Sequence, residues 1–149
     1  MKRIEKILIS GFLLAVVFSF FGFSANCEGI SNKVLRLHVL ANSNSEYDQR
    51  IKLAVKDVVS QYAESLLSGA ENLDESTEII NNNLQNIEHI ANQKLKELHV
   101  HYEAKAIMKN AYFGTREYKD FSLPAGEYQA LRILLGEASG KNWWCVVYP

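Results

Sequence analysis

Apolar and polar residues follow two different periods along the chain, and each change of period marks an element that we expect. Over residues 34–41 leucine and valine alternate with Arg36 and His38, which is typical of a strand with one buried face. From residue 46 to 67 the period lengthens to three or four residues, which predicts an amphipathic helix. Its apolar stripe comprises Ile51, Val55, Val58, Tyr62 and Leu66.

The helix is bounded by residues that favour turns and caps. Ser43 and Glu46 have the spacing of a capping box at its start, and Gly69 breaks it at its end. Asp74 is expected to cap a second helix. The stripe of that helix comprises Ile80, Leu84, Ile87, Ala91, Leu95 and Leu98.

The period returns to two after the second helix. Alternation predicts strands over 99–107, 128–136 and 143–148, and the segment GEASGKN between the last two is expected to be a hairpin loop. The fold predicted for residues 33–149 is therefore α+β, with two amphipathic helices packed on a largely antiparallel sheet of about four strands. The order of the strands is left open.

A separate segment precedes this domain. Residues 1–25 begin with three basic side chains, and residues 7–24 then run without a charge, as in a signal peptide or an N-terminal membrane anchor. A signal peptide and a membrane anchor both predict export of the rest of the chain. A buried core helix is the remaining alternative, and membrane contact is expected only through residues 7–24 if the segment is not cleaved.

The charge of the chain argues against one class of partner. Its 16 basic and 17 acidic residues give a formal net charge of −1, and no cluster of Lys or Arg follows the N-terminal segment. Nucleic-acid binding is not expected, because it requires a basic patch. No cofactor or small-molecule substrate is indicated.

Two sets of residues could carry chemistry, and both are weak. Cys145 could act as a nucleophile with His38 as base and Asn42 as orienting group, but it lies among bulky apolar residues that would raise its pKa. His99 and His101 share a strand face and could bind a metal, yet no spacing supplies further ligands. We expect an inert cysteine, a solvated polar face, and no catalytic or metal site.

Two surfaces are better candidates for recognition. At the strand-to-helix turn, Asp48 and the lysines that follow it have the spacing of salt bridges along an exposed helix face, and a recognition surface is the alternative. At the C-terminal end, the strand 143–148 is apolar on both faces, although a chain with two helices covers only one. We therefore expect one of Trp143 and Trp144 to lie in the core and the other to contact a partner, unless loops such as 108–122 cover both.

Three stretches together resemble the stage II sporulation protein R family of endospore-forming bacteria. They are LRLHVLANSNSEYDQRIKLAVKDVV, LPAGEYQALRILLGE and GKNWWCVVYP, and the resemblance extends from Val34 to Pro149. It implies a secreted sporulation signalling protein that crosses the forespore membrane into the intermembrane space. There it would activate a membrane-embedded aspartic protease, which processes the pro-form of a mother-cell sigma factor.

The resemblance implies that the chain is not an enzyme, and a secreted cysteine- or metal-dependent hydrolase is the alternative. A structural envelope protein is a third class. The family pattern continues to another cysteine, which leaves the partner of a Cys145 disulfide unknown. The residues proposed for partner binding are Asn42, Ser43, Asp48, Gln49, Arg132, Asn142, Trp143 and Trp144.

Overall fold

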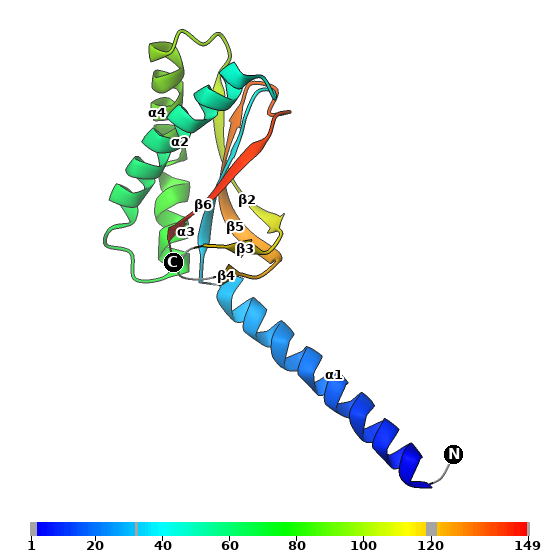
Figure 1. Cartoon of the computed structure of the whole chain (residues 1–149). Helices are drawn as coiled ribbons and strands as arrows, with labels where there is room; N and C mark the ends of the chain where they lie inside the picture. The colour runs from blue at the N-terminus through cyan, green and yellow to red at the C-terminus, as the bar shows by residue number, and fades with distance from the viewer. Residues whose placement is uncertain (1–2, 32, 119–121, 149) are drawn as a thin grey trace.

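The structure is a computed structural model that describes residues 3–31, 33–118 and 122–148, and within its first helix it leaves out the side chains of residue 6 and residues 20–31. Within these ranges four helices and six strands are formed (Figure 1). In chain order they are α1 (Arg3–Ser31), β1 (Leu35–Leu40), α2 (Glu46–Leu67), α3 (Leu73–Asn82), α4 (Leu84–Glu97), β2 (Ala104–Phe113), β3 (Arg116–Glu117), β4 (Ser122–Leu123), β5 (Gly126–Leu135) and β6 (Asn142–Tyr148).

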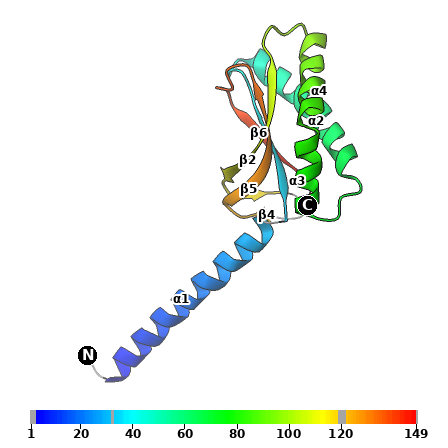
Figure 2. The same ribbon diagram turned by 180° about the vertical axis from the view of Figure 1, so that it is seen from behind.

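The first helix, α1, extends away from the sheet and the other helices (Figures 1 and 2). Its described apolar side chains are largely exposed, with Phe12 at 70% and Phe18 at 71%. In the described part of the chain, no helix combines the length and the apolar character needed to cross a membrane. The assignment of residues 1–25 as a signal peptide or anchor stays a prediction.

The main sheet is mixed. Its strands lie in the order β2-β5-β1-β6, with β1 parallel to β5 and the other two pairings antiparallel. The α+β class and the strands near 34–41, 128–136 and 143–148 are thus confirmed. The largely antiparallel sheet is confirmed only in part, because the central pair is parallel.

The predicted hairpin at the C-terminal end is wrong. β1 lies between β5 and β6, so the loop 136–141 crosses over the end of β1 and β6 pairs with β1 instead of β5. The loop is fixed to that strand end, since the Gly140 amide donates to the Ala41 carbonyl oxygen at 2.9 Å. Central placement of β1 explains why its side chains from Leu35 to Val39 are all buried.

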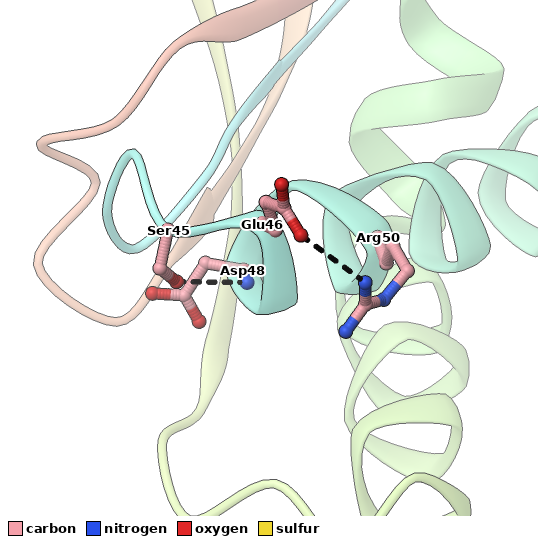
Figure 3. Close-up of polar contacts among 4 residues, drawn as sticks. All are labelled: Ser45, Glu46, Asp48 and Arg50. Atoms are coloured by element: carbon pink, nitrogen blue, oxygen red, sulfur yellow. Dashed lines mark hydrogen bonds and ion pairs between the residues drawn. The ribbon is translucent and has the colours of Figure 1, made fainter.

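Helix α2 has the predicted bounds but a different cap and a slightly rotated buried face. Its N-cap is Ser45, whose side chain accepts a hydrogen bond from the Asp48 amide at 3.1 Å, so the predicted Ser43 cap is displaced by two residues (Figure 3). The buried apolar face then continues along positions that repeat every four residues. It consists of Ile51, Val55, Val59, Ala63 and Leu67. The other members of the predicted stripe, Val58, Tyr62 and Leu66, are half-buried and pack against the same core.

The predicted second helix is two helices. α3 is capped by Asn72 and not by Asp74, and it ends at Asn82; α4 starts at Leu84 after the non-helical Asn83. The run of asparagines that lowers helix propensity is therefore where the helix breaks. Helices α2, α3 and α4 together cover one face of the sheet (Figures 1 and 2), so the prediction of two helices is corrected to three.

The segment after α4 is a turn and not the predicted strand start. The His99 amide donates to the Lys96 carbonyl at 3.0 Å and the Val100 amide donates to the Leu95 carbonyl at 3.0 Å, which is a Schellman motif. Its left-handed position is occupied by His99, with φ of 55°. The strand therefore begins only at Ala104.

The edge of the sheet formed by β2 is covered by polar side chains from α4. Asn92 accepts from the Ala104 amide at 2.8 Å and donates to its carbonyl at 2.9 Å, while Glu88 accepts from the Ala106 amide at 2.9 Å. These bonds satisfy backbone groups that an edge strand leaves unpaired. The opposite edge of the sheet is β6.

The face of the sheet opposite the helices carries a second, smaller core. It lies beneath the connection between β2 and β5, which contains the short β3–β4 hairpin. This core consists of Val34, Phe113, Leu123, Tyr128 and Ala130. Trp144 is half-buried against this core.

Candidate functional site

The polar turn between β1 and α2 is organised around one buried carboxylate. Asp48 is 5% exposed and accepts hydrogen bonds from Asn42 at 2.9 Å and from the Tyr102 hydroxyl at 2.8 Å, as well as from the Ser43 hydroxyl. Burial alone would raise the pKa of Asp48, but these hydrogen bonds outweigh it and lower the pKa. Asp48 is therefore held as a carboxylate.

The same turn binds the loop 136–141 that leads into β6. The Asn42 side-chain oxygen accepts a hydrogen bond from the Glu137 amide at 2.9 Å, and the Asn42 backbone carbonyl oxygen accepts one from the Ser139 hydroxyl at 2.7 Å. A side chain at Gly140 would collide with the backbone of Ser43. Only glycine fits at this contact, so the loop and the turn form one rigid unit.

A buried lysine extends this unit along α2. Lys52 is 5% exposed and donates to the Gln49 side-chain oxygen at 2.7 Å and to the Lys141 carbonyl at 3.2 Å. Burial, followed by the charge of Lys141, lowers the pKa of Lys52. Gln49 in turn donates to the Ser43 carbonyl at 2.9 Å.

The structure therefore brings four predicted partner-binding residues together. Asn42, Ser43, Asp48 and Gln49 use these polar groups to connect the turn, the loop and helix α2. They position the start of β6. Direct contact of these four side chains with a partner stays a prediction.

The two tryptophans of β6 lie on opposite faces of the sheet. Trp144 is paired with His38 and stacks on its ring with centroids 3.7 Å apart, and it also contacts the edge of Phe113 at 4.4 Å. Trp143 lies on the helix side, where Lys56 is 5.2 Å from its ring centroid, and it remains 39% exposed. Trp143 is thus the more exposed of the two, and Trp144 is half-buried. The prediction that one of them lies in the core and the other contacts a partner stays a prediction.

A groove of about 300 Å³ runs between this end of β6 and the β3–β4 hairpin. It is lined by Arg116, Glu117, Tyr118, Asn142, Trp143 and Trp144. Three of the predicted partner-binding residues therefore share one concave surface with Arg116, Glu117 and Tyr118, which lie 24 or more positions earlier in the sequence. Local patterning cannot indicate this neighbourhood.

Basic side chains lie beside Trp144 on the same face of the sheet. Arg36 is fully buried, with its guanidinium carbon 3.9 Å from the Phe113 ring centroid and one weak hydrogen bond to the Tyr118 hydroxyl at 3.4 Å. His38 is 5% exposed, and its pKa is lowered to about 4 by burial and then by the charges of Arg132 and Arg36. His38 is therefore neutral at pH 7.

The predicted catalytic combination is not assembled. Cys145 is paired with Leu37 and points to the helix side, 3.9 Å from the Ser60 hydroxyl, whereas His38 points to the opposite face. Burial raises the pKa of the Cys145 thiol, which disfavours a reactive thiolate. Cys145 is free within the described residues, and the side chain of Cys27 lies outside them.

The two histidines proposed for metal binding lie in the turn after α4. Both are exposed, and His99 is the left-handed residue that ends the helix. His101 also lines a polar pocket of about 490 Å³ beside α4, together with His89 and Glu103. In the described part of the chain, no group of three or more His, Cys, Asp or Glu side chains could hold a metal ion.

Several residues of this region were not identified by their sequence pattern. Arg36 alternates with buried leucines, which predicts an exposed position, and Lys52 follows the buried Ile51 on a helix. Tyr102 and Phe113 are brought to the site by tertiary contacts alone. Only the aromatic character of Phe113 and Tyr102 could have suggested burial.

Comparison with known proteins gives a consistent result. A family model described as stage II sporulation protein R matches residues 31–149. Stage II sporulation protein R of Bacillus subtilis (strain 168) is 32% identical over 120 residues, which cover 80% of this chain and 54% of that protein. The chain thus spans about half the length of this curated relative, and no solved structure matches it.

Proposed function

Because the chain belongs to the stage II sporulation protein R family and acts in sporulation, we propose that it is an exported signalling protein that activates a membrane-embedded aspartic protease. The active protease would then process the pro-form of a mother-cell sigma factor. The N-terminal segment 1–25 would direct the chain across the forespore membrane, and residues 7–24 would contact the membrane if the segment is retained.

The observation that carries this proposal is the exposed aromatic end of β6. Trp143 is 39% exposed beside a groove of about 300 Å³ that Trp144 and Asn142 also line. Tryptophan is enriched at the energetic centres of protein interfaces, where its burial by a partner contributes a large apolar area. The groove therefore supports a protein-binding role.

The position of this groove also supports activation by binding. Its β6 side is held in place by the rigid unit of Asn42, Asp48 and the loop 136–141, which leads directly into β6. A surface that is ordered before association loses less conformational entropy on binding. The partner would therefore meet a preformed site.

The alternative is a secreted hydrolase that uses Cys145 or the His99 and His101 pair. The separation of Cys145 and His38 onto opposite faces of the sheet argues against the cysteine version. Cys145→Ser and the double variant His99→Ala/His101→Ala should leave sigma-factor processing nearly intact if the chain is an activator. Loss of processing in either variant, with normal folding, would support the hydrolase.

The two tryptophans provide a matched test of the binding surface. Trp144→Ala removes the stack on His38 and the contact with Phe113, so it should lower the free energy of unfolding by about 3 kcal/mol. Trp143→Ala should change that free energy by less than about 1.5 kcal/mol, because its ring is partly solvated, yet it should stop protease activation. Urea unfolding and an immunoblot for the processed sigma factor measure the two effects.

Two outcomes would contradict the proposal. If Trp143→Ala folds normally and supports full processing, the β6 groove is not the contact surface. If deletion of the whole gene leaves processing unchanged, the chain is not an activator, and a structural envelope role becomes the better explanation.

A further inference from the structure

In the part of the chain that the structure describes, no helix or hairpin covers the upper part of the sheet face opposite the helices (Figures 1 and 2). Figures 1 and 2 show α2, α3 and α4 on one face, while the β3–β4 hairpin lies at the lower end of the other. Arg36 and Tyr128 are buried under the hairpin segment, whereas Ile107, Leu134 and Leu40 are only half-buried although they belong to the three neighbouring strands β2, β5 and β1. A partly exposed apolar strip therefore crosses the sheet.

Basic side chains flank this strip. Strand pairing places Lys105 opposite Leu134, Ile107 opposite Arg132, and Lys109 opposite Ala130. Because directly paired residues share a face, Lys105, Lys109 and Arg132 all lie on the face that carries His38 and Trp144. Both lysines are exposed.

The main-sheet strand positions of this face carry charged side chains of one sign only, and Glu117 of the β3–β4 hairpin lines the neighbouring groove. None of these strand positions is acidic; they comprise Lys105, Ile107, Lys109, Ala111, Phe113, Gly126, Tyr128, Ala130, Arg132, Leu134, Arg36, His38, Leu40, Asn142, Trp144 and Val146. The Nε atom of Arg132 is buried and has no hydrogen-bond partner within the described chain.

From this arrangement we infer that the uncovered face binds an acidic polypeptide segment of the partner, a role that rests on the proposed function. The carboxylates of that segment would pair with Lys105, Lys109 and Arg132. Lys105 and Lys109 are about 13 Å apart along β2, a spacing that two carboxylates four residues apart on an extended segment reproduce. Apolar side chains of the same segment would cover Ile107 and Leu134.

Anionic lipid is the competing source of negative charge, and the arrangement favours protein. The half-buried apolar strip lies between the basic side chains, which is the organisation of a protein interface with an apolar centre and a charged rim. The face also continues, through Asn142 and Trp144, into the groove beside Trp143. One partner can therefore occupy the groove and the basic face together.

The test uses a double charge reversal with a matched control. Lys105→Glu/Lys109→Glu changes two exposed lysines on the uncovered face, and Arg50→Glu/Lys96→Glu makes the same charge change on exposed positions of α2 and α4. Each full-length variant replaces the chromosomal copy in the spore-forming host, and immunoblots measure the chain and the processed sigma factor. The reversal should reduce processing at least about tenfold, while the control processes normally.

The test distinguishes failure of the proposed function from failure of the inferred binding face. If deletion abolishes processing but Lys105→Glu/Lys109→Glu is as active as the control, the proposed function stands and the basic face is not the binding surface. If deletion has no effect, the proposed function itself fails. Arg132→Gln provides a second measurement and should also weaken processing without changing the amount of the chain.

Vesicle binding separates the lipid from the protein. The full-length wild type and both double variants are sedimented with vesicles of phosphatidylcholine alone or with added phosphatidylglycerol. Equal binding of the two double variants to the anionic vesicles is expected. Selective loss of that binding in Lys105→Glu/Lys109→Glu would identify the face as a lipid site and overturn the inference.

Discussion

His38 makes the stability of the domain depend on pH. Its side chain is 5% exposed between Arg36 and Arg132, and its pKa is lowered from 6.5 to about 4 by burial and by those two charges. The unfolded chain therefore binds a proton more readily than the folded one. This contribution to stability is complete above pH 6.5 and is lost as the pH falls toward 4.

The magnitude follows from the two pKa values. Between pH 7.5 and pH 4.5, protonation of the unfolded state should reduce the free energy of unfolding by about 2.5 kcal/mol through His38 alone. His38→Phe keeps an aromatic ring against Trp144 but removes the titrating group. Its loss of stability over the same pH interval should be smaller than that of the wild type by this amount.

The assay is urea unfolding followed by tryptophan fluorescence at both pH values. The exposed His89 provides the control, because His89→Gln retains His38 and should retain the full wild-type loss. Equal losses in the wild type and His38→Phe would refute the reasoning, since they would mean that His38 takes up its proton in the folded state as easily as in the unfolded state.

Three further changes test the turn and the helix end. Gly140→Ala should destabilise the domain by about 2 kcal/mol or more in urea unfolding, because its new methyl group collides with the Ser43 backbone; the exposed Gly69→Ala is the control. Asp48→Asn should cost about 2 kcal/mol at pH 7, measured in the same way, because donors from Asn42, Ser43 and Tyr102 lose a charged acceptor. His99→Gly should raise the thermal midpoint by about 4 °C, because glycine adopts φ of 55° without strain, and a lower midpoint would contradict this.

The pattern of apolar and polar residues predicts an element correctly where the burial of its side chains depends mainly on that strand or helix itself. The alternation around Leu37 and the period along α2 identify β1 and a helix with the observed bounds. The same reasoning misplaced the next strand, because Val100 and Tyr102 imitate a period of two inside the turn that His99 creates. Alternation over five residues does not distinguish a strand from a turn whose side chains happen to face the protein.

Pairing and covering depend on distant parts of the chain. No local sequence pattern indicates that β1 lies between β5 and β6, or that it runs parallel to β5. A buried strand has the same apolar pattern whichever strands lie beside it. Arg36 was expected to face solvent because the hairpin that covers it begins 80 residues later. The aromatic end of β6 was recognised as a candidate surface, but its groove partners Arg116 and Tyr118 were not.

The central claim is that this chain activates a protease through binding. The most direct measurement mixes the purified full-length chain with the membrane-embedded aspartic protease in vesicles, and follows cleavage of the pro-form of the sigma factor over time. Cleavage should require both proteins, should proceed with Cys145→Ser, and should be lost with Trp143→Ala. Cleavage by the chain without the protease, or protease activity that does not change when the chain is added, would contradict the account.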